Sequence, residues 1–306
     1  SEVDFAAGAA ILYRKRDGLK LEDYIAKAKD AKIEVVHDLD KAAKVRGKRV
    51  LLLPENPKSK TLEYAPDCKE GDWTIVDFTN SAITYLEREA KKDGFMLMVE
   101  AGHLDYCAHD NDAVATFEEV NDLSESVQLA LDFYNKHPNE TLIIVTADHE
   151  TGGLCLGYKS YKMNMERLAW QKCSMLALTD KMRTMRNEGK TSWEQMQELL
   201  RKELGFWDHV RLRGKDEEQL RKTFEKSFVE KSEEVVSLYS HNEKMASKAV
   251  EILNKRAYVN WISLNHTGAQ VPLYVKGAGV EQFYNCFDNT DIPKSIARSL
   301  GTTLAE

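Results

Sequence analysis

The stretch Thr141-Leu-Ile-Ile-Val-Thr-Ala-Asp-His-Glu-Thr-Gly-Gly153 indicates both how the chain folds and where its chemistry lies. Its apolar start, residues 141–145, has the length and composition of a buried strand. Asp148, His149 and Glu150 follow the strand directly, and two glycines come after them. Ligands bind beyond the carboxyl ends of strands in open α/β sheets, so we expect a site at this strand end. The glycines would let the backbone approach that site closely and then turn away.

Short apolar runs alternate with helical segments on both sides of this stretch. Further strands are expected at residues 33–36, 49–53, 95–99 and 271–275, and helices at 22–29, 77–92, 112–136 and 292–300. Buried strands that alternate with helices are typical of a parallel sheet covered on both faces. The sequence therefore predicts an α/β fold with a parallel-type central sheet flanked by helices.

Residues 158–260 differ from the rest of the chain because they are rich in Lys, Glu, Met and Arg. Thr191-Ser-Trp-Glu194 is read as a capping box that opens a helix, with Trp193, Met196, Leu200 and Leu204 facing inward. Two more helical segments are expected at residues 216–239 and 244–257. We predict a large helical insert at 158–260, between two parts of an α/β core at 1–157 and 261–306. Its charged residues are expected to form a solvated face.

Composition excludes some classes of function. The chain has 306 residues and a formal net charge of −7, which argues against a basic surface for nucleic acid. No apolar run approaches the roughly 20 residues that would span a bilayer, and no signal peptide is recognisable. The five cysteines form no CxxC pair, so they predict neither a disulfide framework nor a zinc knuckle.

Two other segments carry acidic and imidazole side chains near expected strands. Glu100, Asp105 and His109 follow the strand expected at 95–99, and His266 precedes the one expected at 271–275. Asp105 and His109 are four residues apart, so a helical turn would point both side chains the same way. A carboxylate and imidazoles so placed suit zinc. A lone histidine is more often an ordinary residue, but three such segments around one sheet favour a metal site.

These segments resemble three motifs of the alkaline phosphatases. Val99-Glu-Ala-Gly-His-Leu-Asp-Tyr-Cys-Ala-His109 resembles a metal-binding motif of that family, and Thr146-Ala-Asp-His-Glu-Thr-Gly-Gly153 resembles the second. His266-Thr-Gly-Ala-Gln-Val-Pro-Leu-Tyr-Val275, with Asp288-Asn-Thr-Asp291 downstream, is similar to the third. The likeness covers most of the chain outside the helical insert, and the order of the motifs agrees.

The resemblance implies a phosphate monoester hydrolase that uses two zinc ions, one magnesium ion and a phosphoserine intermediate. It implies the following metal ligands: Asp105, His109 and His266 for the first zinc, Asp148 and His149 for the second, and Glu100 for magnesium. Glu150 would support a ligand by hydrogen bonding and would not bind metal itself. His103 and Tyr106 vary from the common pattern and are given no role beyond such support.

The sequence departs from the family upstream of Glu100. No stretch there resembles the family's nucleophilic serine, its phosphate-holding arginine, its bridging aspartate or its remaining magnesium ligands. Asn80-Ser81-Ala82 echoes the nucleophile, but it falls in a predicted helix and not in an exposed turn. We therefore expect the chain to be the C-terminal part of a longer phosphatase, with the catalytic serine upstream and little or no activity on its own.

Several alternatives stay open from the sequence. The chain could come from another metal-dependent enzyme of the same superfamily: a phosphomutase, phosphodiesterase or sulfatase. It could also be a non-catalytic metal-binding module whose helical insert engages a partner. A purely structural Asp148–His149 pair would not explain why three segments match. The resemblance further implies a homodimer that is periplasmic or secreted and acts on a phosphate monoester.

Overall fold

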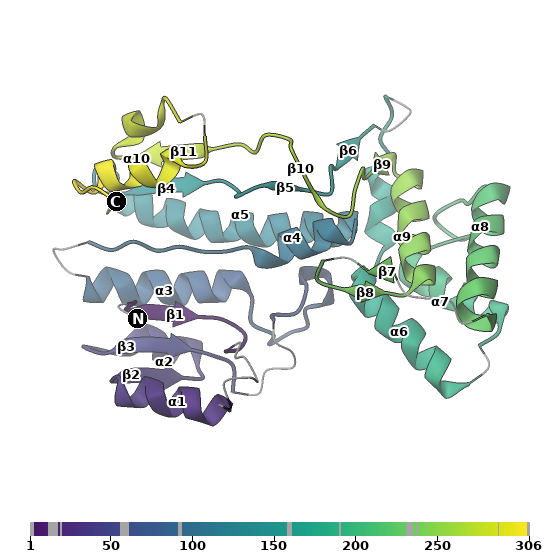
Figure 1. Cartoon of the computed structure of the whole chain (residues 1–306), viewed down its shortest axis with the longest axis horizontal. Helices are drawn as coiled ribbons and strands as arrows, with labels where there is room; N and C mark the ends of the chain where they lie inside the picture. The colour runs from purple at the N-terminus through teal and green to yellow at the C-terminus, as the bar shows by residue number, and fades with distance from the viewer. Residues whose placement is uncertain are drawn as a thin grey trace. The chain divides into compact units, whose positions relative to one another are not determined.

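The computed structural model describes residues 3–11, 18, 20–55, 61–90, 94–157, 161–189, 191–230, 235–236, 238–286 and 288–304 (Figure 1). The chain forms two compact units. The first contains residues 1–102 and 118–129, and the second contains residues 103–117 and 130–306. The architecture is mixed α/β, as the sequence predicts.

The first unit is built on a parallel sheet of three strands in the order β1-β3-β2 (Figure 1). The strands are β1 (Phe5–Ala7), β2 (Ile33–Val36) and β3 (Arg49–Leu52), and the helices are α1 (Leu21–Asp30), α2 (Leu39–Lys44) and α3 (Ile75–Glu89). A short 3₁₀ turn, η2 (Ala65–Asp67), precedes α3. Apolar side chains of the sheet and of α3 form one core, which includes Phe5, Val50, Leu52, Phe78 and Tyr85. The predicted strands and helices of this region are confirmed, and β1 adds a strand that the sequence did not indicate.

The prediction of a strand at residues 95–99 is wrong. Residues 94–101 form no strand or helix, and their side chains alternate between exposed and half-buried. Met96 and Met98 are 64% and 77% exposed, whereas Phe95 and Leu97 pack against the core of the first unit. Residues 95–99 thus have one packed face and one exposed face. The sequence predicts a fully buried strand there only because methionine counts as apolar whether or not it is exposed.

Antiparallel pairs dominate the sheet structure of the second unit. β4 (Leu142–Val145) pairs with β11 (Tyr274–Gly277), β5 (Glu150–Thr151) with β10 (His266–Thr267), and β6 (Cys155–Leu156) with β9 (Val259–Asn260). α4 (Gly102–His109) and α5 (Ala113–Lys136) precede these strands, and η5 (Val280–Phe283) and α10 (Asp291–Ser299) follow them. The strand predicted at 141–145 and the helix at 112–136 are confirmed. The last strand starts at Tyr274, three residues later than predicted, and runs antiparallel to β4.

The helices within residues 158–260 share one apolar core. They are η3 (Met165–Trp170), α6 (Met175–Glu188), α7 (Trp193–Leu204), α8 (Gly214–Phe224), the π-helical turn η4 (Glu225–Val229) and α9 (Lys244–Arg256); the short strands β7 (Val235–Val236) and β8 (His241–Asn242) lie between η4 and α9. Met196, Leu200 and Leu204 of α7 are fully buried in this core, as predicted. The core also includes Ala113 and Val114 from the start of α5.

Two details of this helical region differ from the sequence prediction. The capping box of α7 is formed by Ser192 and Gln195, one residue later than the predicted pair. The Ser192 amide donates to Gln195 Oε1 at 2.8 Å, and the Gln195 amide donates to Ser192 Oγ at 3.2 Å. The helix expected at 216–239 ends earlier, since α8 and η4 stop at Val229. The three-part domain division remains a prediction. None of the described helices is both long and apolar enough to cross a membrane.

Candidate metal centre

Asp105 and His109 lie one helical turn apart on α4, as their spacing predicts. Their side chains face each other, with 3.5 Å between Asp105 Oδ1 and His109 Nε2. The His109 side chain is only 1% exposed, and that of Asp105 is 27% exposed. The short helix α4 thus presents a partly exposed carboxylate beside a buried imidazole.

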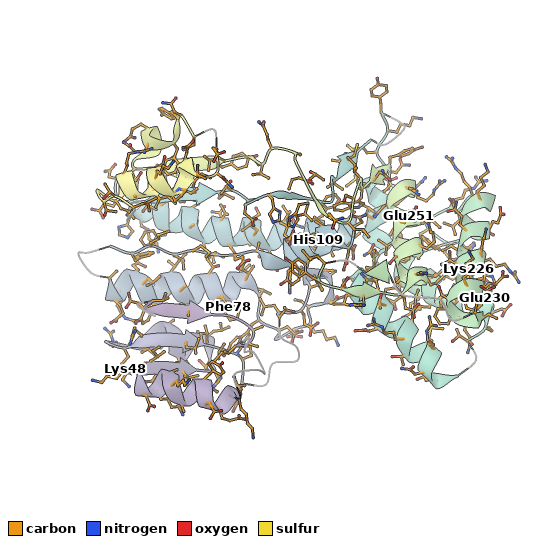
Figure 2. All side chains as sticks on the ribbon, in the orientation of Figure 1. Lys48, Phe78, His109, Lys226, Glu230 and Glu251 are labelled. Atoms are coloured by element: carbon orange, nitrogen blue, oxygen red, sulfur yellow. The ribbon has the colours of Figure 1, made fainter. Side chains whose placement is uncertain are left out.

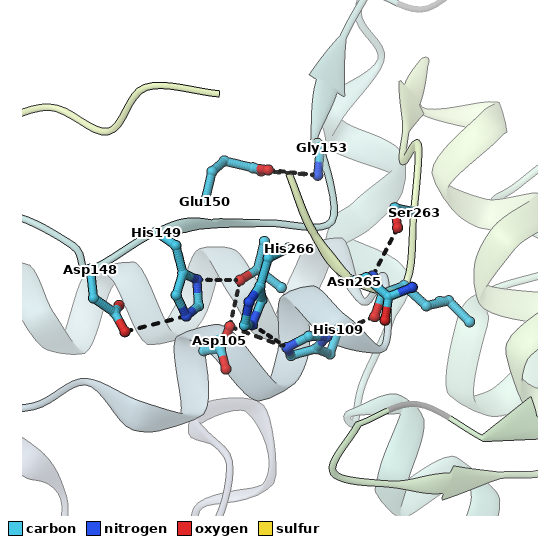
Figure 3. A network of polar contacts seen from close by, with 11 residues as sticks. Asp105, His109, Asp148, His149, Glu150, Gly153, Ser263, Asn265 and His266 are labelled. Carbon is cyan, nitrogen blue, oxygen red and sulfur yellow. Dashed lines mark hydrogen bonds and ion pairs between the residues drawn. The ribbon is translucent and has the colours of Figure 1, made fainter. Parts of the chain in front are cut away.

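The β5–β10 pair brings His266 to this helix. His266 lies opposite Thr151 in the antiparallel register. Its Nε2 atom is 3.1 Å from His109 Nε2, across 157 positions of sequence (Figure 3). Ligand atoms of Asp105, His149 and His266 also lie within 4.8 Å of one another. The fold therefore gathers side chains from all three sequence motifs into one cluster.

A backbone hydrogen bond fixes the tautomer of His109. Its Nδ1 atom is 2.7 Å from the carbonyl oxygen of Leu264. A carbonyl can only accept, so Nδ1 carries the proton and donates it. Neutral His109 therefore presents the lone pair of Nε2 to Asp105 and His266. A metal-binding histidine is normally oriented by a hydrogen bond of this kind.

Thr151 sets the corresponding direction for His149. Its hydroxyl donates to Asp105 Oδ1 at 2.5 Å, and its oxygen lies 3.2 Å from His149 Nδ1. The single hydroxyl proton goes to the carboxylate, which can only accept, so His149 Nδ1 must donate to Thr151. His149 thereby turns Nε2 toward Asp148, and Nε2 is the ring atom left to face a metal. One threonine thus orients two of the predicted metal ligands.

Asp148 and His149 are the outer part of the cluster. Asp148 Oδ2 is 3.2 Å from His149 Nε2, and the Asp148 side chain is 86% exposed. The His149 ring stacks on that of His266, with centroids 3.5 Å apart and an interplanar angle of 26°. The adjacent side chains of Asp148 and His149 therefore point toward each other. His149 links Asp148 to His266 and the buried part of the cluster.

Glu150 and the two glycines hold the backbone beside the cluster. The Glu150 carboxylate accepts a hydrogen bond from the Gly153 amide at 2.9 Å (Figure 3). It also accepts one from the Thr267 hydroxyl. Gly152 has φ +83°, and a Cβ there would lie 2.6 Å from the Trp261 ring and 2.8 Å from the Ala108 carbonyl oxygen. Glu150 therefore ties β5 to β10, and Gly152 lets the chain pass close to the end of α4.

Two other residues considered from the sequence lie in the first unit. Glu100, the predicted magnesium ligand, is exposed within the irregular segment 94–101 of the first unit. Ser81 is 3% exposed on α3, and its hydroxyl donates to the Leu39 carbonyl at 3.0 Å. A buried serine whose proton is already donated to the backbone is not a nucleophile, in agreement with the sequence argument.

Sequence reasoning missed two contributors to the cluster. Thr151 lies in the second motif, but only the folded structure shows that its hydroxyl reaches Asp105. Tyr239 stacks on Tyr106 with ring centroids 4.1 Å apart and packs edge-on against His109 at 5.3 Å. Tyr239 is 130 residues from His109 in a segment without any motif, so no sequence signal pointed to it.

The residues present fit a zinc ion. Two ligand atoms about 2.1 Å from zinc at tetrahedral corners are about 3.4 Å apart. His109 Nε2 is 3.1 Å from His266 Nε2 and 3.5 Å from Asp105 Oδ1. Imidazole-rich sites prefer zinc over magnesium, which favours oxygen ligands. Asp105, His109 and His266 therefore offer a carboxylate and two imidazoles, which is a donor set that zinc accepts, while the three residues whose ligand atoms all lie within 4.8 Å of one another are Asp105, His149 and His266.

Sequence comparisons find alkaline phosphatases among the relatives of this chain. The chain is 32% identical over 231 residues to Alkaline phosphatase 3 of Bacillus subtilis, covering 74% of this chain and 44% of that protein. It is 33% identical to Alkaline phosphatase 4 of the same organism, covering 75% and 44%. The chain thus spans less than half the length of these curated relatives.

Solved alkaline phosphatases share the fold. The cold-active enzyme of Shewanella sp. matches with a TM-score of 0.73 and 20% identity, covering 97% of this chain and 65% of that chain. The enzyme of Thermus thermophilus matches with a TM-score of 0.72 and 24% identity, covering 98% and 63%. The family model for alkaline phosphatase matches residues 8–302. The extent of this match, together with the fold and the order of the motifs, shows that this chain belongs to the alkaline phosphatase family.

Proposed function

We propose that the chain forms the zinc-binding part of an enzyme that hydrolyses phosphate monoesters. The observation that supports this most strongly is the convergence of Asp105, His109 and His266. Hydrogen bonds with Thr151 and Leu264 orient the side chains of Asp105 and His109. Membership of a metal-dependent phosphatase family supports the choice of reaction. Asp105, His109 and His266 would hold the first zinc, and Asp148 with His149 would contribute to the second.

Glu100 would be a magnesium ligand, as the family resemblance implies. A mutant of the alkaline phosphatase from the Antarctic bacterium TAB5 has Mg bound in its M3 site, and this chain matches that structure with a TM-score of 0.58 and 18% identity. Glu100 belongs to the motif that also carries Asp105 and His109, and its exposed carboxylate is an oxygen donor of the kind that magnesium prefers.

The protein residues prepare the site before any substrate arrives. Zinc bound there would polarise a phosphoryl oxygen and stabilise the charge that develops in the transition state. His109 keeps its Nε2 lone pair toward the cluster because its Nδ1 proton is donated to Leu264. Thr151 holds Asp105 and His149 together through one hydroxyl. The exposed face of Asp148 and His149 leaves a side from which an anionic ester can approach.

The remaining parts of the proposal rest on the family resemblance alone. The attacking serine, the phosphoserine intermediate and low activity of this chain by itself are predictions. A homodimer and export to the periplasm or the medium are predictions as well. Among the alternatives, a phosphodiesterase or sulfatase would use a similar metal cluster, whereas a non-catalytic module would bind metal without binding a phosphate ester.

Phenylphosphonate, a dianionic monoester analogue that cannot be hydrolysed, tests the proposal without requiring turnover. Isothermal titration calorimetry would compare zinc-loaded and chelator-treated protein. We expect saturable binding only to the zinc-loaded form, at least tenfold weaker binding of methyl phenylphosphonate and phenyl sulfate, and loss of binding in His266→Ala. His37→Ala, which changes a histidine of the first unit, is the matched control and should bind normally.

Each other outcome points to a different function. Preference for methyl phenylphosphonate would favour a phosphodiesterase, and preference for phenyl sulfate would favour a sulfatase. Tight zinc binding without affinity for any of the three anions would contradict hydrolysis and favour a metal-binding module.

A further inference from the structure

Tyr239, from the region 158–260, lies against the candidate metal centre without being one of its predicted ligands. Its ring stacks on that of Tyr106, with centroids 4.1 Å apart and an interplanar angle of 26°, and it packs edge-on against His109 at 5.3 Å. His109, labelled in Figure 2, is buried, whereas Tyr239 is 50% exposed. The Tyr239 ring is thus covered on one face by Tyr106, and half of the residue is open to solvent.

A buried hydrogen-bond network next to Tyr239 fixes its position. The Ser240 hydroxyl donates to Asp110 Oδ1 and accepts from Asn242 Nδ2 at 2.8 Å. All three of these residues are buried. Asp110 directly follows His109, so the end of α4 both carries a predicted metal ligand and anchors the neighbour of Tyr239. Because buried polar groups depend on their partners, this network keeps Tyr239 beside the metal cluster.

Tyr239 and the predicted ligand His266 are two exposed rings that pack against the same buried ring. The His266 ring centroid is 4.9 Å from that of His109, and the Tyr239 centroid is 5.3 Å from it. His266 is one of the exposed members of the metal cluster. No more than the His109 ring therefore separates Tyr239 from the part of the cluster that a substrate can reach. A small ester bound there would have Tyr239 within reach of its organic group.

A fixed and half-open aromatic ring favours an aromatic partner. Two rings attract each other in offset or edge-to-face arrangements, and such a contact strengthens binding by about two- to tenfold beyond the apolar area that it buries. The phosphate group is the same in every phosphate monoester, so it cannot distinguish one ester from another. A contact between Tyr239 and the organic group would therefore select esters of phenols over esters of small aliphatic alcohols.

We propose that Tyr239 is a specificity-determining residue that makes the site prefer phosphate monoesters of phenols. The aromatic ring of such an ester packs on the open part of Tyr239 while its phosphate group lies at the metal cluster. Tyr106 supports the covered face of the Tyr239 ring, and Ser240 holds the adjacent backbone. This inference rests on the proposed function, because it concerns the same site. It gives the region 158–260 a direct part in substrate selection.

Calorimetry on the zinc-loaded protein with phenylphosphonate and methylphosphonate tests the role of Tyr239. The two probes share the phosphonate group and differ in the phenyl ring, and any difference in their acidity is the same for every variant. We expect the parent and Tyr239→Phe to bind phenylphosphonate at least about fivefold more tightly, and Tyr239→Ala to lose at least about threefold of this preference. Tyr239→Ala should keep its zinc and its affinity for methylphosphonate. Tyr284→Ala, at an exposed tyrosine of the same unit, is the control and should keep the preference.

Three results would overturn this inference and leave the proposed function intact. The first is a parent that binds both phosphonates equally well. The second is an unchanged preference in Tyr239→Ala. The third is an equal loss of both phosphonates in Tyr239→Ala together with a loss of zinc in elemental analysis, which would show that the ring only shields His109. If the zinc-loaded parent bound neither phosphonate, the proposed function would fail and this inference would fail with it.

Discussion

The Thr151 hydroxyl donates to Asp105 Oδ1 at 2.5 Å and lies 3.2 Å from His149 Nδ1. This contact joins the second motif of the chain to the first, across 46 positions of sequence. It also occupies Nδ1 of His149, and therefore leaves Nε2 as the atom that could face a metal. Thr151 is not one of the predicted ligands, but it orients a predicted ligand on each side.

Removing the Thr151 hydroxyl should weaken zinc binding. Thr151→Val keeps the shape of the side chain but leaves Asp105 and His149 without their shared partner. Supporting hydrogen bonds of this type are worth about 10–100-fold in metal affinity, and we expect a loss of that size in a chelator competition titration. Thr151→Ser should retain most of the affinity. Thr184→Val, on the surface of α6, is the matched control, and an equal loss there would contradict this role for Thr151.

Gly152 should tolerate no side chain. A Cβ there would lie 2.8 Å from the Ala108 carbonyl oxygen, which is backbone and cannot move aside easily, and φ is +83°. Gly152→Ala should lower the free energy of unfolding by more than about 2 kcal/mol in urea titrations. Gly301, with φ +67° and nothing within 4 Å of an added Cβ, provides the control. Gly301→Ala should cost only the backbone strain, about 1–2 kcal/mol, and an equal cost at both positions would show that the contact is unimportant.

These predictions show what the sequence could and could not indicate. Spacing alone indicated that Asp105 and His109 share a face, because four residues make about one helical turn. The resemblance to the alkaline phosphatases, and not spacing, indicated that His266 joins them. The pairing partner of a strand is not encoded in its own apolar pattern, so the antiparallel β4–β11 and β5–β10 pairs could not be predicted. The strand predicted at 95–99 failed for a different reason. Met96 and Met98 are apolar but exposed, and composition does not show which way a side chain points.

Asp112 should make stability fall as pH rises. This carboxyl caps α5 and accepts from the Met175 amide at 2.6 Å and from Gln171 Nε2 at 2.8 Å. Burial nevertheless raises its pKa from 3.8 to about 6, partly offset by these donors. A raised folded-state pKa means that the folded state binds more protons between about pH 4 and 6, so the contribution to stability declines across that window.

The Asp112→Asn variant isolates this effect, because an amide does not titrate. The parent's stability relative to the variant should fall by about 2–3 kcal/mol between pH 4 and pH 7 in urea unfolding, as a shift of about two pKa units implies. A parent that becomes relatively more stable as pH rises would mean that the ionised carboxylate is the preferred form. Asp180→Asn, at an exposed position of α6, should show little change with pH.

Cysteine alkylation should distinguish Cys155 from Cys68. Burial, together with the nearby carboxylates of Asp122 and Asp72, raises the pKa of Cys68 from 9.0 to about 11. The thiolate is the reactive form, so Cys68 should stay almost unmodified by iodoacetamide at pH 8. Cys155 is exposed and should react first. Mass spectrometry of peptides after brief labelling measures both, and faster labelling of Cys68 would contradict this description of its surroundings.

The zinc content of the dialysed protein tests the central claim most directly. Elemental analysis would compare the parent, His266→Ala and the control His37→Ala after loading with zinc. We predict about one tightly held zinc per chain in the parent and in the control, and its loss in His266→Ala, since the proposed site uses Asp105, His109 and His266 as its three ligands. A parent that retains no zinc, or a His266→Ala variant that retains as much as the parent, would contradict the account.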